Sequence, residues 1–123
     1  MSEISDTLLK QRIRNRFIEA FDDFADIEKV SVLGTTEIIE TWYDFMHDGK
    51  TDFYDEPVFT QTETAAIVSF HATLESCFDK IPETWKPTEV SDSAEWNTLK
   101  LEAKAYLKLF MERGVMDDEK EVF

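Results

Sequence analysis

The sequence has little of the material from which disulfide-linked, loop-rich or nucleotide-binding proteins are built. Its 123 residues include one cysteine, three glycines and three prolines. A single cysteine cannot form an intramolecular disulfide, so we expect a reducing, cytoplasmic setting. Three glycines cannot supply a glycine-rich phosphate loop, and neither a Walker-type nor a dinucleotide-binding motif is present. The scarcity of turn-forming residues favours long helices over many short strands.

Long apolar runs and an excess of positive charge are also missing. No stretch of about 18 apolar residues predicts a membrane span, and the first residues lack the pattern of a signal peptide. The net charge is −14, with fifteen acids against two lysines over residues 17–79, which disfavours nucleic acid as a partner. Hydrophobic residues still make up 42% of the chain, enough for one buried core, so we expect a single helical domain over residues 1–123.

What the sequence has in abundance is helical periodicity, which is clearest over residues 61–81. Thr60 and Glu63 have the spacing of a capping box, in which each side chain satisfies the other residue's free backbone donor. Apolar residues, Phe78 among them, then recur every three or four positions, and Pro82 ends the pattern. This segment predicts a long helix with one buried face.

Four amphipathic segments of this kind predict an all-α fold, a four-helix up-and-down bundle of regular or irregular form. We expect the helices at about residues 6–27, 35–48, 61–81 and 93–113. Residues 29–34 are interpreted as a short connection, and Trp85 is expected to cover one end of the core. The acidic tail at 115–123 is expected to be mobile.

The charges are segregated along the chain. Lys10, Arg12, Arg14 and Arg16 form a basic patch that we expect to pair internally. The acids gather on the outer faces of the first two helices, and no lysine or arginine lies within the second helix to neutralise them. A one-sided surface of this kind either keeps the protein soluble or attracts a basic partner. The candidate partner-binding acids are Asp22, Asp23, Asp26, Glu37, Glu40, Asp44 and Asp48.

Aromatic residues accompany these acids. Tyr43 lies at the edge of the apolar face of the second helix, and Phe53 and Tyr54 alternate with acids in the loop over residues 50–59. Aromatic side chains ringed by acids suit a basic partner, so these three are candidate anchors. The alternative is that the loop aromatics cover the core as a lid.

No arrangement of residues indicates catalysis. Cys77 lies on an apolar helix face and is expected to be a small core residue. His47 and His71 each have an acid at helical spacing, but the apolar faces turn these residues to the boundary or outside, which argues against a metal site in the core. We therefore predict no enzyme activity, no cofactor and no metal.

The last helix carries a second apolar stripe formed by Leu101, Ala105 and Leu109. A helix with two apolar faces lies between neighbours or meets another subunit. A homodimer through this stripe is one expectation.

The leading functional hypothesis is a small acidic protein of the immunity or inhibitor type that docks on a basic partner, such as a nuclease toxin. It rests on composition: a small, strongly acidic domain without a catalytic motif. The alternatives are a bundle with an apolar ligand pocket or, less favoured, a metal-dependent enzyme using His47 and His71. The pocket would be lined by Trp42, Phe70, Trp96 and Tyr106.

Overall fold

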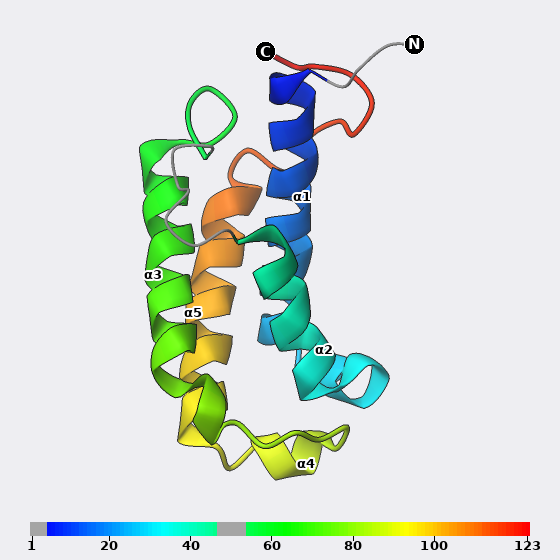
Figure 1. Ribbon diagram of the computed structural model, residues 1–123, viewed down its shortest axis with the longest axis vertical. Helices are drawn as coiled ribbons and strands as arrows, with labels where there is room; N and C mark the ends of the chain where they lie inside the picture. The colour runs from blue at the N-terminus through cyan, green and yellow to red at the C-terminus, as the bar shows by residue number, and fades with distance from the viewer. Residues whose placement is uncertain (1–4, 47–53) are drawn as a thin grey trace.

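The computed structural model describes residues 5–46 and 54–123, and within them every long element is a helix. The elements in chain order are α1 (Asp6–Ala25), α2 (Lys29–Phe45), α3 (Gln61–Cys77), the 3₁₀ turn η2 (Phe78–Lys80), α4 (Pro87–Val90) and α5 (Ala94–Met111). α1 and α3 run in one direction while α2 and α5 return in the other (Figure 1). The predicted all-α, four-helix, up-and-down bundle is confirmed, with the short α4 as an addition.

Side-chain caps begin three of the four long helices. The capping box of Thr60 and Glu63 is formed, with both reciprocal hydrogen bonds at 3.0 Å. The hydroxyl of Ser5 accepts from the amide of Leu8 at the start of α1, and Ser93 does the same for α5. Each cap satisfies a backbone donor that the first turn leaves free.

The second helix begins earlier than the sequence predicts. Residues 29–34, expected to be a connection, form the first turns of α2, and the helical conformation is interrupted only at Gly34 (φ 78°, ψ 154°). Glycine is the residue that adopts this conformation without strain, because it lacks a Cβ atom. α2 is therefore a kinked helix whose second part carries the predicted acidic row.

Aromatic side chains fill the centre of the bundle. Phe21 contacts four other rings at centroid distances of 5.3 to 5.8 Å. The fully buried aromatic residues are Phe17, Phe21, Phe24, Trp42, Phe59, Phe70, Trp96 and Phe110. Together with the buried aliphatic residues they form one hydrophobic core, to which all four long helices contribute.

A buried ion cluster joins α1, α3 and the end of α5. Arg14 is fully buried and donates from Nη2 to Glu63 Oε2 at 2.7 Å and to the Phe110 carbonyl at 2.9 Å. Arg113 donates to the other carboxylate oxygen of Glu63, which also accepts from the Thr60 amide. Burial alone would raise the pKa of Glu63, but the hydrogen bonds from Arg14, Arg113 and Thr60 outweigh it and lower the pKa below its ordinary value.

The C-terminal segment, expected to be mobile, instead lies along the first half of α1 (Figure 1). The buried Gln11 amide donates to the carbonyls of Asp117 and Lys120, and its oxygen accepts from the amide of Val122. Asn15 binds both backbone groups of Met116 in the same way. The tail is thus held through its main chain, a feature that its side-chain composition does not reveal.

The basic patch of α1 pairs within the chain, as expected, in part with this C-terminal segment. Arg12 donates to the Asp118 carbonyl, and Arg16 lies 3.6 Å from the Asp118 carboxylate and 2.7 Å from that of Glu19. Lys10 pairs with Asp55 at 2.6 Å.

Within the described residues, no helix has both the length and the apolarity to cross a membrane.

We predict that Glu63→Ala lowers the free energy of unfolding by about 3–5 kcal/mol, because it leaves the buried Arg14 guanidinium without its counter-charge. Urea unfolding followed by circular dichroism measures this loss. Gln61→Ala, an exposed change in the same first turn, is the matched control and is expected to stay within about 0.5 kcal/mol of the wild type.

The contribution of Glu63 to the free energy of unfolding is expected to decrease at acid pH. Because the folded-state pKa of Glu63 is depressed, its contribution is fully present above the ordinary value of 4.5 and is lost as the pH falls below it toward the folded-state pKa. Glu63→Gln is therefore expected to flatten the acid limb of stability against pH. An unchanged acid limb in this variant contradicts the assignment.

A third prediction concerns the C-terminal segment. Asn15→Ala removes the side chain that pairs with both backbone groups of Met116, so the tail should detach more often and be cleaved faster by a protease. Limited proteolysis followed by mass spectrometry measures the rate of cleavage within residues 115–123. Asn97→Ala is the control, because it removes an exposed side-chain hydrogen bond from Asn97 of α5 to the Ser91 carbonyl. Equal cleavage rates in the two variants would reject the anchoring role of Asn15.

Candidate functional site

The acids of α2 have no counter-charge among the residues at 5–46 and 54–123. Glu37, Glu40 and Asp44 follow one another at three and four residues on one face of the helix, and all three are exposed. None of them takes part in an ion pair with any residue that the structure describes. Asp48 lies outside the described residues. The helix thus presents a row of unneutralised carboxylates.

The acids of α1 are in a different situation. The Lys29 ammonium lies 3.5 Å from the Asp22 carboxylate and 3.4 Å from that of Asp23. Burial raises the pKa of Asp23 above its ordinary value, against the lowering effect of Lys29. Asp26 accepts a hydrogen bond from the amide of Glu28 and so terminates the turn after α1. All three acids have a partner within the fold, and their role in binding a basic protein stays a prediction.

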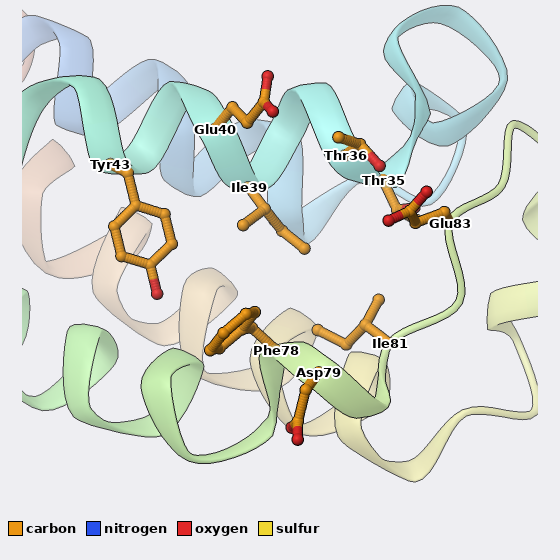
Figure 2. A pocket seen from close by; sticks show the side chains of 9 residues that line it. All are labelled: Thr35, Thr36, Ile39, Glu40, Tyr43, Phe78, Asp79, Ile81 and Glu83. Carbon is orange, nitrogen blue, oxygen red and sulfur yellow. The ribbon is translucent and has the colours of Figure 1, made fainter.

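A hollow of about 350 Å³ lies between α2 and the η2 region (Figure 2). Ile39 and Tyr43 project from α2 toward Phe78 and Ile81 on the other side, and these four side chains form apolar walls. The remaining residues that line it are Thr35, Thr36, Glu40, Asp79 and Glu83. Among the described residues, the lining therefore contains three carboxylates and no lysine or arginine.

A second hollow of about 350 Å³ adjoins the first and shares Thr35, Thr36 and Glu83 with it. It is bordered by Glu37 and by Trp85, whose side chain is 61% exposed. We call the two hollows together with the acidic row of α2 the α2–η2 face, defined by Glu37, Glu40, Tyr43, Asp44, Phe78, Asp79, Glu83 and Trp85. It combines exposed aromatic surface with acids that form no ion pair with any described residue.

The kink at Gly34 and the residue after it hold this face together. Thr35 donates from its amide to the Thr84 carbonyl and from its hydroxyl to the Pro82 carbonyl, and its hydroxyl accepts from the Thr84 amide. The indole of Trp85 lies directly over Gly34, where an added Cβ would come within 2.9 Å of the ring. These contacts fix the segment that carries Glu83 and Trp85 against α2.

A hydrogen-bonded chain fixes the other end of α2 to α3. The buried indole of Trp42 donates to Nδ1 of His71 at 3.1 Å, and Nε2 of His71 lies 3.1 Å from the Glu75 carboxylate. The Tyr43 hydroxyl lies 3.5 Å from the same carboxylate. His71 is at the boundary of the core, as the sequence predicts; its Nδ1 binds Trp42 of α2, and its Nε2 pairs with Glu75 within α3.

Of the three predicted aromatic anchors, Tyr54 is buried and therefore not available on this face. Tyr54 is 2% exposed, packs against Phe17 and Phe59, and donates to the Phe45 carbonyl. Its prediction as a surface anchor is therefore wrong, and the alternative of a lid over the core holds for this residue. Phe53 lies outside the described residues. Tyr43 lines the first hollow together with Glu40.

Sequence reasoning missed the two exposed aromatic residues of the face. Phe78, predicted to point inward, is 47% exposed, because the chain tightens to a 3₁₀ turn after Cys77 and rotates the side chain away from the α-helical stripe. Trp85 was expected to cover the core but lies over Gly34 with most of its surface exposed. The position of Trp85 in a turn-rich segment beside Glu83 was the available signal for exposure.

The predicted apolar pocket is filled by its own side chains. Trp42 and Phe70 are in contact at a centroid distance of 4.8 Å, and Phe70 contacts Tyr106 at 6.4 Å. Trp96 packs against Phe24 at 5.5 Å. The space between these four residues, where a ligand was considered, is therefore part of the core.

Other candidate chemistry is not assembled in the described residues. Cys77 is buried, its thiol lies 3.2 Å from the Thr73 carbonyl, and burial raises its pKa, which disfavours the reactive thiolate. No group of three potential metal ligands occurs among the residues the structure describes, and His47 lies outside them. On α5, Leu101 is 64% exposed and Ala105 is exposed, while Leu109 packs partly against the core. The homodimer stays a prediction.

Comparison with protein-family models, curated proteins and solved structures finds no significant match.

We predict that Gly34→Ala disturbs the α2–η2 face. The substitution places a methyl group against the Trp85 indole and forces alanine into a conformation that only glycine adopts readily, so we expect a loss of about 1–3 kcal/mol in stability. Trp42 and Trp96 are fully buried, so quenching of tryptophan fluorescence by acrylamide reports mainly on Trp85. Quenching should increase in the variant.

Gly114→Ala is the matched control. Gly114 also has a positive φ, of 79°, but an added Cβ there would meet nothing within 4 Å. It should lose stability through backbone strain and leave the quenching of Trp85 unchanged. Equal quenching in both variants would show that Gly34 does not position Trp85.

Proposed function

We propose that this chain is an acidic binding protein of the inhibitor or immunity type, which acts by docking its α2–η2 face on a basic surface of a partner protein. The nucleic-acid-binding site of a nuclease toxin is a basic surface of the required kind. The proposal includes a cytoplasmic setting and a mode of action by binding, without catalysis. Nucleic acid itself is disfavoured as a partner, because a chain of net charge −14 repels phosphates.

The observation that carries this proposal is that the α2 acids of the α2–η2 face have no ion pair within the part of the chain that the structure describes. The basic residues of α1 engage Asp55, Glu19, Asp118 and the tail carbonyls, and Lys29 engages the acids of α1. Glu37, Glu40 and Asp44 are left without such partners among the described residues. Concentrated like charge destabilises a fold through self-repulsion, and its recognised advantage is fast association with an oppositely charged partner.

Exposed aromatic surface within the acidic region supports binding over mere solubility. Phe78 and Trp85 are 47% and 61% exposed, and each of them lines a hollow of the surface. A surface that serves solubility alone gains nothing from exposed large aromatic side chains. At interfaces such residues supply a large share of the binding energy, while surrounding charges set the rate of association and the choice of partner.

The test uses charge reversal on the proposed face. Glu40→Lys combined with Asp44→Lys should slow association with a basic partner roughly tenfold at low salt, because attraction over this surface is replaced by repulsion. The partner is first isolated by capture on the immobilised chain at low salt and elution at high salt. Stopped-flow measurements over a range of salt concentrations then give the association rates.

Asp92→Lys combined with Glu112→Lys is the control, since it makes the same change in net charge at two exposed positions outside the face. This variant should retain most of the wild-type association rate. If both double variants slow association equally, only the total charge matters and the α2–η2 face is not the docking surface. If affinity for the captured partner does not depend on salt, the proposal fails as a whole.

A further inference from the structure

Apolar side chains form the walls of the first hollow. Ile39 and Tyr43 on one side face Phe78 and Ile81 on the other, with an open gap between them (Figure 2). The hollow exists because α2 packs mainly against α1 and reaches α3 through the side-chain contacts of Trp42, Tyr43 and His71. Its volume of about 350 Å³ falls within the range of sites that hold small ligands or single side chains.

The charges lie at the rim of this hollow and not at its base. In Figure 2 the carboxylate of Glu40 points away from the gap on the α2 side, and that of Asp79 points away on the opposite side. Glu83 lies at one end of the gap, near Thr35. A cation buried between the apolar walls would lose its water without meeting a carboxylate, which is unfavourable. A ligand that places an apolar group between the walls and positive charges at the rim matches both the apolar walls and the carboxylates around them.

The length of the acidic row favours a polypeptide over a small molecule as the occupant. Glu37 and Asp44 are seven residues apart on one helix face, a span of about 10 Å. A small amphipathic cation seated in the hollow reaches the rim but leaves the rest of this row unused. A peptide segment with several basic residues engages the row and the rim together.

We infer that the hollow between α2 and η2 receives one apolar or aromatic side chain from a basic segment of the partner protein, whose flanking lysine or arginine residues lie against Glu40, Asp79 and Glu83. This inference rests on the proposed function and adds a specific anchor to it. The apolar side chain supplies affinity by burial against Ile39 and Phe78. The flanking charges supply orientation and the rate of association.

Short synthetic peptides test the inference on the full-length chain. The probe has one phenylalanine between two pairs of lysines, and its two counterparts replace the phenylalanine by serine or the lysines by glutamates. Binding is followed by amide chemical shifts of the ¹⁵N-labelled protein. The lysine–phenylalanine peptide should bind about tenfold more tightly than the serine peptide and shift the amides of Tyr43, Phe78 and Glu83. The glutamate peptide should not bind.

Two variants assign the contributions within the hollow. Phe78→Ala should weaken the lysine–phenylalanine peptide about tenfold and leave its salt dependence unchanged, because only an apolar wall is removed. Glu83→Gln should instead reduce the salt dependence of the affinity for this peptide, because it removes one negative charge from the rim. Val68→Ala, a truncation of an exposed apolar residue on α3, is the control and should change neither quantity. Melting curves of each variant establish that it is folded.

The outcomes separate this inference from the proposed function. If the serine peptide binds as tightly as the phenylalanine peptide and Phe78→Ala has no effect, the anchor is wrong while docking on basic partners stands. If the glutamate peptide binds as well as the lysine peptide, the hollow accepts apolar groups without regard to charge, and the proposed function fails. If no lysine peptide binds at low salt, both fail.

A second copy of this chain is the competing occupant. Leu101 is 64% exposed and lies beside Lys100 and Lys104 on α5, so it offers an apolar side chain flanked by bases. If the amide signals around Phe78 shift on dilution of the protein alone, and Leu101→Ser abolishes this shift, the hollow binds a second copy and the inference is overturned.

Discussion

The buried carboxylate of Glu63 constrains the arrangement of three of the four long helices. It belongs to the first turn of α3, caps that helix, and accepts from Arg14 of α1 and Arg113 just beyond α5. A buried charge without a partner is strongly destabilising, so α1, α3 and α5 must meet at this point in one register. The aromatic core then fills the space that this arrangement defines. α2 has no part in the ion cluster, and its position depends on separate contacts at its two ends.

This division explains why α2 carries the candidate site. Its side chains Trp42 and Thr35 bind His71 of α3 and the segment at 82–84, while its backbone packs mainly against α1. Between these two points of attachment the helix stands away from η2, and the first hollow lies there. A helix integrated as closely as α1 would have covered Phe78. The exposed aromatic surface is therefore a consequence of how α2 is attached, and the unpaired acids lie on the same helix.

The helices were predictable because caps and apolar periodicity are local signals. The sequence predicts a connection at 29–34, but in the fold Gly34 is a kink inside α2, where the contacts of Gly34 with Trp85 and of Thr35 with Thr84 are tertiary and leave no local signal. α4, with four residues, is too short to show a period. The role of Glu63 as a cap was visible in the spacing from Thr60. Its ion pairs with Arg14 and Arg113 were not, since they join residues about 50 positions apart.

The candidate site was predictable in its charge and not in its aromatic part. Helical spacing alone places Glu37, Glu40 and Asp44 on one face, but whether an acid is neutralised depends on which cations the fold brings near. Lys29 reaches back to Asp22 and Asp23 only because α2 begins immediately after the turn at 26–28. The tail likewise lies over the basic half of α1, held by hydrogen bonds from the side chains of Gln11 and Asn15 to its main chain. The pattern of side chains in the tail does not predict these bonds. Each of these contacts removes basic side chains from the surface. The basic side chains of α1 and Lys29 are thereby engaged, while Glu37, Glu40 and Asp44 of α2 form no ion pair with any described residue, a charge distribution that suits docking on a basic partner.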